Sequence, residues 1–414
     1  MLLSAGGRAY VSRMKQAYPA SITGKGGSGF ATGVSVLDHK FGASDPYTLG
    51  VEEEYMLLDS ETFDLVQHID TVLAAVAGHE LEPRINAELM QSVLEIATPV
   101  CRTAGDVAEQ LQKIRAYVCD VARDKGLRVG SAGTHPFSLF ERQRITARDR
   151  YRHLVDQLQY VARRELIFGM HIHVAIDDPE KAIQVVNGLV AHLSPLLALS
   201  ASSPFWRGEP TGLRSSRQMV FAAFPRSGPP PRFKDYTEYA EVVGQLEKTG
   251  CIADYTHIWW DIRLHPRLGT VEIRICDAVT RVEDAVALTA YCQALVKQLC
   301  ERFEAGEEIP SYHRILTTEN KWLAARYGLE APVMDLATGR RNRVPLAQTI
   351  RRTLREIEPH ARELGSEREL EGIKEILMRG NGADRQLRIF NANRDIVEVV
   401  SEIANATEVA ALPA

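Results

Sequence analysis

Hydrophobic and polar residues alternate over several short stretches of this chain, and such alternation is the period of a β-strand. In residues 270–276, Glu272 and Arg274 fall on one face of the predicted strand, whereas Ile273 falls on the other. The same pattern recurs in four other stretches, so polar side chains share one face of five predicted strands. These polar positions are Glu52 and Glu54, Glu95, His171 and His173, Asp261 and Arg263, and Glu272 and Arg274.

A longer hydrophobic period, of three to four residues, predicts helices elsewhere. Between residues 104 and 125, Val107, Leu111 and Ile114 recur on one helix face, and Gly126 ends the pattern. Other helices are predicted at 142–164 in part, 178–200, 283–303, 346–364, 367–379 and 393–406. Further strands are predicted at 128–132, 169–176, 259–264 and 269–276, and loops at 202–233 and 379–386.

The order of these elements indicates the fold class. Hairpins are interrupted by helices without a regular β–α–β alternation, which predicts an α+β fold built on a curved antiparallel sheet. Helices would cover the apolar face of the sheet, and the polar face would carry a site. Residues 1–45 are rich in glycine and serine and are predicted to be a flexible extension. Residues 46–414 are predicted to form a single domain.

Composition narrows the possible partners. The chain has 414 residues, of which 45% are hydrophobic and 25% charged, as in ordinary globular proteins. Its net charge of −5, without a basic stripe, argues against nucleic acid as a partner. No stretch approaches the roughly 20 apolar residues of a membrane helix, so no membrane partner is expected. The six cysteines are scattered without a Cys-x-x-Cys motif, which is typical of reduced thiols in a cytoplasmic protein.

The mixture of carboxylates and arginines on one sheet face suggests a chemistry. Such a face is costly to bury for packing alone. Carboxylate oxygens suit Mg²⁺ or Mn²⁺, and a histidine is compatible with Mn²⁺. Arginines beside them would neutralise phosphate oxygens through bidentate hydrogen bonds. The combination favours phosphoryl transfer from a metal–nucleotide complex. Glu53 lies on the opposite face of its strand and is predicted to form a structural salt bridge instead.

Other interpretations remain open at this point. A single Glu-x-Glu pair on an amphipathic strand is more often a solvated outer face. A His-x-His strand also occurs in hydrolases with two metals, which would make the protein a metal-dependent amidohydrolase with a β/α barrel. A non-catalytic protein that senses a nucleotide would use the same face for binding alone.

Several motifs resemble one family when they are taken in order. They are Gly50-Val51-Glu52-Glu53-Glu54-Tyr55, the Glu88/Glu95 spacing, Gly169-Met170-His171-Ile172-His173-Val174, Ser203-Pro204-Phe205-Trp206, residues 259–277 and Asn381-Gly382-Ala383-Asp384-Arg385-Gln386. Together they resemble the bacterial glutamate–cysteine ligase type 2 family, specifically its carboxylate–amine ligase branch, over residues 46–405. The resemblance implies a glutamine-synthetase-like fold and the joining of a carboxylate to an amine with ATP and Mg²⁺.

The resemblance also implies roles for individual residues. Metal would be held by Glu52, Glu54, Glu88, Glu95, His171 and Glu272. Arg274 would hold the transferring phosphate. Apart from the resemblance, Arg263 is a second catalytic candidate, and Arg217, Arg214, His173 and Arg385 are candidates for contacts to substrate or phosphate.

Two of these positions depart from the family pattern. His173 stands where the better-known members have asparagine, and Arg214 stands where a small residue is expected.

The substrates would be glutamate as the carboxylate and cysteine or another amine as acceptor. The loop at 202–233 would act as a lid, and the resemblance suggests a homodimer.

Overall fold

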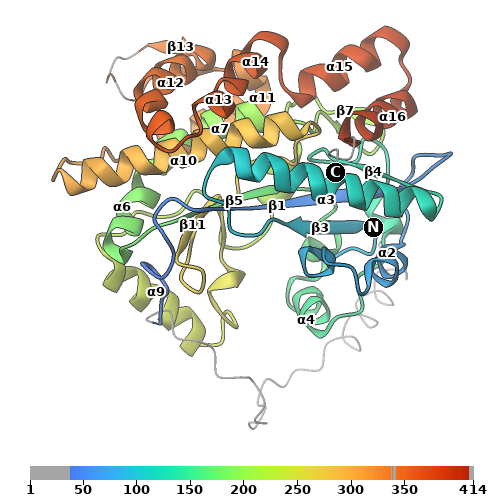
Figure 1. The fold of residues 1–414 in the computed structure, drawn as a ribbon, viewed down its shortest axis with the longest axis horizontal. Helices are drawn as coiled ribbons and strands as arrows, with labels where there is room; N and C mark the ends of the chain where they lie inside the picture. Colours follow the sequence, from blue (N-terminus) through green and yellow to red (C-terminus); the bar gives the residue numbers. More distant parts are fainter. Residues whose placement is uncertain (1–37, 337, 339–341, 410–414) are drawn as a thin grey trace, which may run out of the picture. The chain divides into compact units, whose positions relative to one another are not determined.

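A seven-stranded antiparallel sheet forms the centre of the computed structural model, which describes residues 38–336, 338 and 342–409 (Figure 1). Strands follow one another across the sheet in the order β10-β11-β5-β1-β3-β2, and β4 pairs with the far end of β1. Their bounds are β1 Leu49–Asp59, β2 Ile85–Ala87, β3 Val93–Ala97, β4 Leu127–Gly130, β5 Met170–Ala175, β10 Ile262–His265 and β11 Thr270–Ile273. The predicted α+β class is confirmed, and this antiparallel sheet contradicts the β/α barrel that the amidohydrolase interpretation required.

The apolar face of the sheet packs against two long helices, α3 (Ala104–Asp124) and α10 (Val282–Glu304), which lie on the same side of it (Figure 1). Val51, Tyr55 and Leu57 of β1 are buried in this core. On the other face of the same strand, Glu52 and Glu54 are followed by apolar side chains that belong to a second core cluster. The polar site therefore occupies only part of that face.

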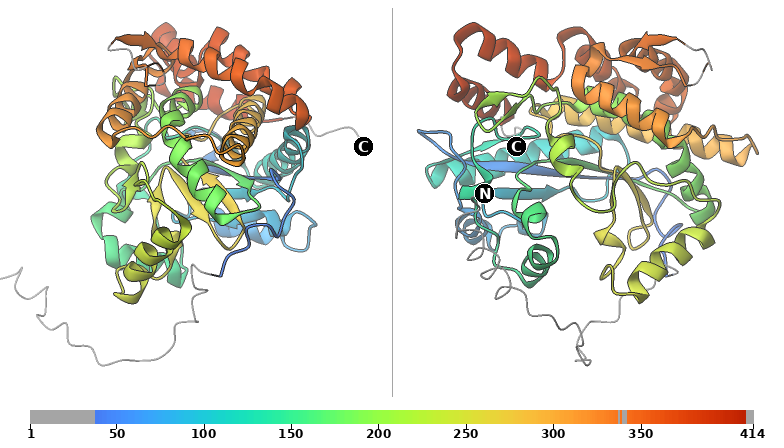
Figure 2. Two further views of the ribbon diagram at one scale, coloured as in Figure 1. Left: turned by 90° about the vertical axis from the view of Figure 1, so that its left-hand side faces the viewer. Right: turned by 180° about the vertical axis from the view of Figure 1, so that it is seen from behind.

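The remaining helices fall into two groups. Most of the C-terminal helices lie beyond α10, whereas α4 and α9 lie on the opposite side of the sheet (Figures 1 and 2). Their bounds are α2 Ile69–Val76, α4 Asp149–Leu158, α5 Tyr160–Arg163, α6 Pro179–Leu189, α7 Leu193–Ser200, α8 Arg217–Phe221, α9 Tyr236–Lys248, α11 Arg314–Tyr327, α12 Leu346–Glu363, α13 Glu367–Leu370, α14 Gly372–Arg379, α15 Gly382–Asn393 and α16 Ile396–Thr407.

One helical run differs from what hydropathy suggested. Residues Pro179–Ser200, which include α6 and α7, are long and apolar enough to cross a membrane, although the sequence analysis found no such stretch. Most of the run, 78% of its most apolar window, is buried inside the fold. Because most of the run is buried, we interpret it as part of the protein core, where a helical segment can be as long and as apolar as one that crosses a membrane.

The segment predicted as a loop at 202–233 contains regular structure. Residues 202–233 hold α8 and three two-residue strands, β6 (Phe205–Trp206), β7 (Glu209–Pro210) and β8 (Ser227–Gly228). Strand β8 pairs in parallel with β9 (Trp259–Trp260), so residues 259–260 leave the predicted hairpin. A small hairpin, β12 (Pro332–Met334) with β13 (Arg343–Pro345), lies among the helices.

The loop predicted at 379–386 is wrong over most of its length, because α15 begins at Gly382. The break is confined to Gly380, whose φ of 87° ends α14, and Asn381. The side chain of Asn381 accepts a hydrogen bond from the backbone N–H of Asp384, and the Asp384 carboxylate accepts one in return. This capping box provides hydrogen-bond partners for the backbone groups at the start of α15. The glycines and the asparagine had suggested a loop because the same residue types are common in loops.

The ordered unit begins before the predicted boundary at residue 46. Lys40 donates its backbone N–H to Pro266, Gly42 donates to Ile176, and the Phe41 side chain is buried in the core. A Cβ on Gly269 would lie 2.3 Å from the carbonyl oxygen of Lys40, so this turn needs a glycine. The rest of the predicted flexible extension, residues 1–37, lies outside the described residues.

Candidate active site

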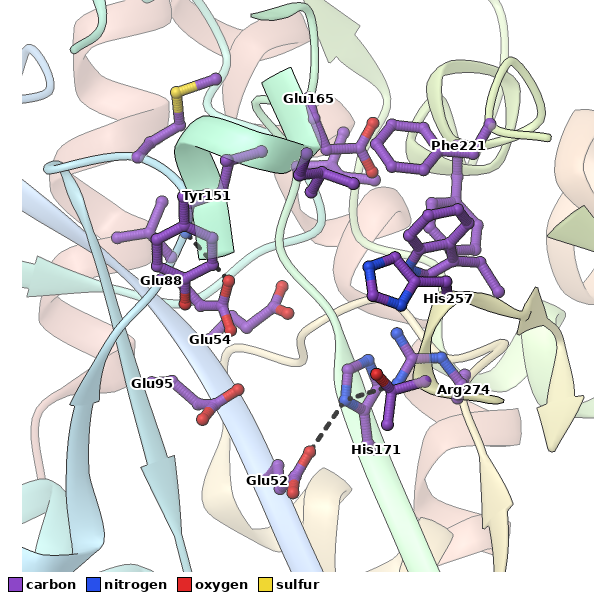
Figure 3. A pocket seen from close by; sticks show the side chains of 18 of the residues that line it. Glu52, Glu54, Glu88, Glu95, Tyr151, Glu165, His171, Phe221, His257 and Arg274 are labelled. Carbon is purple, nitrogen blue, oxygen red and sulfur yellow. Dashed lines mark hydrogen bonds and ion pairs between the residues drawn. The ribbon is translucent and has the colours of Figure 1, made fainter. Parts of the chain in front are cut away.

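A pocket of about 310 Å³ opens on the polar face of the sheet (Figure 3). Carboxylates from β1, from β3 and from the turn before β3 form one wall, with Glu54, Glu88 and Glu95 close together. Arg274 and His171 lie on the other wall, with Phe221 and His257 above them. The pocket thus holds a concentrated negative wall opposite a positive one.

Strand register brings these side chains together. Glu54 of β1 lies opposite Glu95 of β3, and Glu52 lies opposite His171 of β5. On the next strands, Glu272 of β11 lies opposite both His173 and Arg263. Residues that face each other across a sheet have their side chains within contact distance. Five strands therefore contribute to one site, as the alternating pattern predicted.

The acidic wall is electrostatically unfavourable by itself. Burial, together with the neighbouring charge of Glu88, raises the pKa of Glu54 to about 7. Burial and the same neighbour raise the pKa of Glu95 well above its usual value. Carboxylates crowded in this way repel each other unless a cation or protons lie between them.

On the opposite wall, Arg263 and Arg274 line the pocket and are both held by Glu272, which is buried and does not line the pocket itself. Arg263 donates to both carboxylate oxygens of Glu272, over 2.7 and 3.0 Å, and Arg274 donates to one of them. Although burial acts in the other direction, these arginines hold the pKa of Glu272 well below its usual value. Arg274 also has a buried Nε without a hydrogen-bond partner. Part of its hydrogen-bonding capacity therefore remains available to a ligand.

The two histidines of β5 differ in their surroundings. His171 Nδ1 lies 3.1 Å from Glu52 Oε2, and burial with the nearby Arg274 lowers its pKa to about 4. It is therefore neutral at neutral pH, the form that binds metal. His173 Nδ1 contacts the Thr270 hydroxyl at 3.0 Å.

The remaining ring nitrogen of His173 faces two carboxylates. His173 Nε2 has no hydrogen-bond partner and lies 3.6 Å from Glu52 Oε1 and 4.0 Å from Glu272 Oε1. Burial opposes its charged form, but these carboxylates raise its pKa. Among the described residues, Glu52, His173 and Glu272 form a set whose ligand atoms lie within 4.8 Å of one another. Both histidines therefore fit a metal, and the assignment to His171 stays a prediction.

Arg217, at the start of α8, reaches the pocket from the segment predicted as a loop. Its guanidinium donates to the carbonyls of Ile275 and Arg274, each over 3.3 Å, and its Nε is buried without a partner. A Cβ on Gly169 would lie 2.5 Å from Arg217 Nη2, so this approach requires a glycine there.

Behind Arg217 lies Asp277, a fully buried carboxylate that the sequence analysis did not select. It accepts hydrogen bonds from the Ser202 backbone (3.0 Å) and from the hydroxyls of Ser203 (2.6 Å) and Ser215 (2.9 Å). Asp277 Oδ1 lies 3.9 Å from Arg217 Nη1. This carboxylate therefore joins the 202–217 segment to the end of β11 and holds it near the pocket.

Five predicted polar positions are not among the residues that line the pocket: Glu272 and His173, which lie close to lining residues, and Asp261, Arg214 and Arg385. Asp261 forms an ion pair with Lys321 at 2.7 Å, and Arg214 forms one with Asp384 at 3.0 Å. Arg385 lies on α15, and burial together with the nearby Arg281 lowers its pKa to about 10. The predicted substrate or phosphate contacts of Arg214 and Arg385 have no support from the pocket.

The motif that contains Arg385 packs α15 onto the rest of the fold. Asn381 Nδ2 donates to Ala198, and Gln386 Nε2 donates to Ser202 over 2.6 Å. A Cβ on Gly382 would lie 2.8 Å from the Ser202 side chain, which explains the glycine. The motif therefore supports the turn that carries the hydrogen bonds to Asp277.

Sequence reasoning missed several pocket residues. Glu165, Tyr151, His257 and Phe221 all line the pocket but belong to helices or connecting segments rather than to the alternating strands. No residue pattern connects them, because tertiary packing alone brings them to the sheet. By contrast, Glu53 behaves as predicted, forming a buried ion pair with Arg115.

The antiparallel α+β sheet and its pocket of carboxylates and arginines agree with the fold class and site that the sequence predicted. The sequence model of glutamate–cysteine ligase family 2 matches residues 48–402, and the chain belongs to this family. The family resemblance inferred from the motifs is thereby confirmed, and the protein is a ligase of the glutamate–cysteine ligase type.

Relatives with provisional names support this placement. Glutamate–cysteine ligase 2-1 of Rubrobacter xylanophilus is 42% identical over 90% of this chain and 97% of its own length. Glutamate–cysteine ligase 2 of Solibacter usitatus is 42% identical over 87% of this chain and 93% of its own length.

Solved structures show the same fold at low sequence identity. Glutamate–cysteine ligase from Francisella tularensis, in complex with AMP, is 14% identical with a TM-score of 0.64, over 89% of this chain and 91% of that one. A bifunctional glutathione synthetase from Pasteurella multocida is 17% identical with a TM-score of 0.64, over 87% of this chain and 53% of that one.

Proposed function

We propose that this protein joins a carboxylate, glutamate by family relationship, to an amine in a reaction that consumes ATP and requires Mg²⁺. The carboxylate attacks the γ-phosphorus of ATP and releases ADP, which leaves an acyl phosphate. The amine then attacks the acyl carbon, and inorganic phosphate departs. The acyl phosphate is needed because a carboxylate oxygen is a poor leaving group.

The observation that carries this proposal is the pairing of the two walls in one pocket. Hydrolysis of an amide needs no wall of arginines, whereas phosphoryl transfer from ATP must cancel the repulsion between triphosphate and carboxylate. Arg274 lies across the pocket from Glu54, Glu88 and Glu95 (Figure 3). The AMP complex of the Francisella tularensis enzyme supports use of an adenine nucleotide on this fold.

The acidic wall fits Mg²⁺. Its carboxylates raise each other's pKa values, and a divalent cation would remove that repulsion. We assign Glu52, Glu54, Glu88, Glu95, His171 and Glu272 as the residues that would hold metal, with His173 as a further candidate because of its free Nε2. When bound, Mg²⁺ would neutralise phosphate charge and orient the triphosphate.

The arginines bind and position the transferring group. Arg274 keeps a buried Nε free while Glu272 fixes its other end, so its guanidinium is held in place before substrate arrives. Arg263 is anchored by carbonyls of Thr256 and Ile258 as well as by Glu272. Arg217 reaches the pocket from the other side, where a substrate carboxylate or a phosphate oxygen would meet its Nε. The 202–233 segment remains our candidate for excluding water from the acyl phosphate.

The proposal is tested by measuring ADP release from ATP and Mg²⁺ with glutamate, across a panel of amines that includes cysteine. Amine-dependent ADP release, with a ligated product of matching mass, is the expected result. ATP binding without ADP release under any amine would instead favour the non-catalytic sensor. Glu375→Gln, an exposed carboxylate of α14 outside the pocket lining, serves as a matched control that should keep full activity.

A further inference from the structure

The Glu165 carboxylate lines the pocket, but the proposed binding of metal and phosphate assigns it no role. Glu165 lies in the segment between α5 and β5, and its carboxyl group points toward Phe221 (Figure 3). Its Oε2 is inaccessible to solvent and has no hydrogen-bond partner among the described residues. A buried carboxylate oxygen without a donor is uncommon, because burying a polar atom without a hydrogen bond is unfavourable.

The surroundings of Glu165 distinguish it from the other pocket carboxylates. Ile167 and Phe221, which form a small apolar cluster, line the pocket with it. The charged groups that act on it are Arg217 of α8, Arg164 of its own segment, Arg274 beyond β11 and Glu54 of β1. Burial is the strongest influence, and it raises the pKa of Glu165 to about 8 despite these arginines.

The second half of the proposed reaction needs a proton acceptor. A primary amine is an ammonium ion at neutral pH and has no lone pair with which to attack an acyl phosphate. The acceptor must lose a proton first, and a base works best when its pKa lies near the operating pH. The acidic wall, His171 and Glu272 are the groups proposed above to hold metal, so the base is sought among the other pocket residues.

Tyr151, His265 and His257 also line the pocket. Burial raises the pKa of Tyr151 and lowers that of His265 to about 4, so the comparison is between Glu165 and His257. The Nδ1 atom of His257 lies 3.8 Å from a carboxylate oxygen of Asp254, which faces it from the same turn. His257 Nδ1, like Glu165 Oε2, is buried without a hydrogen-bond partner among the described residues. Glu165 differs in that it has no oppositely charged or carboxylate partner at ion-pair distance among those residues, while its carboxyl group lies at the pocket beside Phe221.

We propose that Glu165 is the general base that deprotonates the amine acceptor, a role that rests on the proposed ligase function. One oxygen of the Glu165 carboxylate takes a proton from the R–NH₃⁺ group, which leaves neutral R–NH₂ and a neutral carboxyl group. The amine lone pair then forms the bond to the acyl carbon, and the bond between that carbon and the phosphate oxygen breaks. Phosphate leaves with the bonding electrons and takes up the second proton, which the nitrogen must lose to become a neutral amide.

Hydroxylamine separates this role from a structural one, because its nitrogen is neutral at neutral pH and needs no base. The full-length wild type and Glu165→Gln are compared with hydroxylamine, with ammonium and with L-cysteine as acceptors, in the presence of ATP, Mg²⁺ and glutamate. Glu165→Gln should lower kcat with ammonium or cysteine by at least about 100-fold, the lower end for a general base. Hydroxamate formation should stay within about twofold of wild type, since that reaction bypasses the base.

Matched variants sharpen the comparison. Glu165→Asp keeps a carboxylate and should recover part of the amine-dependent rate. Glu247→Gln removes another carboxylate that has an unpartnered buried oxygen, on α9 and outside the pocket lining, and should change neither reaction. His257→Asn should lower both reactions equally or leave both unchanged.

The outcomes separate this role from the ligase function itself. Equal losses with all acceptors in Glu165→Gln, a change in KM alone, or selective loss in His257→Asn would overturn the role of Glu165. A wild type that uses hydroxylamine but neither protonated amine would overturn it as well. Absence of both hydroxamate and ADP in the wild type would instead reject the ligase function.

Discussion

The ion pair between Glu53 and Arg115 lies directly behind the site and offers a sharp test of the fold. Both side chains are at most 1% exposed. Arg115 Nε donates to Glu53 over 2.9 Å, and its terminal nitrogens donate to Glu53 and to the carbonyls of Val279 and Thr280. Glu53 stands between Glu52 and Glu54 on β1, so this pair fixes the strand that carries both carboxylates.

Replacing Arg115 with methionine should be strongly destabilising. The change leaves the Glu53 carboxylate buried without its counter-charge, and breaking a buried pair in this way costs about 3–5 kcal/mol of unfolding free energy. With an unfolding entropy of roughly 0.8 kcal/mol per degree for a domain of this size, Tm should fall by about 4–6 °C. The double variant Glu53→Leu with Arg115→Met removes both charges and should be more stable than Arg115→Met.

The assay is urea unfolding followed by tryptophan fluorescence, with calorimetry for Tm. Arg152→Met provides the matched control, because Arg152 pairs with Asp149 over 3.2 Å with side chains 62% and 99% exposed. Loss of this surface pair should cost less than about 1 kcal/mol. A loss of less than 1 kcal/mol in Arg115→Met, or a double variant less stable than the single one, would refute the reasoning.

Three further predictions concern the site. Glu272→Gln should lower turnover at least about 100-fold and reduce unfolding free energy by roughly 3 kcal/mol, because two buried arginines lose their counter-charge; wild-type ADP release would contradict this. Asp277→Asn should lower kcat/KM by about 10- to 100-fold through misplacement of Arg217, whereas Asp335→Asn, which breaks an ion pair outside the pocket lining, should not. Glu54, with its pKa raised from 4.5 to about 7, contributes stability that is full below pH 4.5 and lost as pH rises through 7. Mg²⁺ should therefore raise Tm more at pH 8 than at pH 6, and calorimetry should detect more protons released on Mg²⁺ binding at pH 6; equal values at both pH values would contradict this.

The sequence predicted much of the site because strand alternation is a local property. Polar residues two positions apart must share a face, so Glu52 with Glu54, and Glu272 with Arg274, could be paired before any fold was known. The same rule placed Glu53 on the opposite face, where it meets Arg115. The family resemblance then supplied the expected fold and chemistry.

Segments without a period were predicted less well. Helix α15 was missed because glycine and asparagine occur both in loops and at helix starts, and only the reciprocal bonds of Asn381 and Asp384 distinguish the two. Arg385 was assigned to the substrate from its motif, yet that motif packs α15 against the turn at Ser202. Local composition does not reveal which distant surface a motif contacts.

The sequence by itself indicated the fold class and the polar face of most strands, since these follow from spacing along the chain, and the resemblance of its ordered motifs indicated the family. Tertiary structure alone decided the register that sets Glu54 opposite Glu95 and Glu272 opposite Arg263. It also brought Glu165 and the buried Asp277 to the site from segments with no strand pattern. The physical reason is that burial, mutual repulsion and unpartnered atoms depend on distances between residues far apart in the chain, which no local pattern encodes.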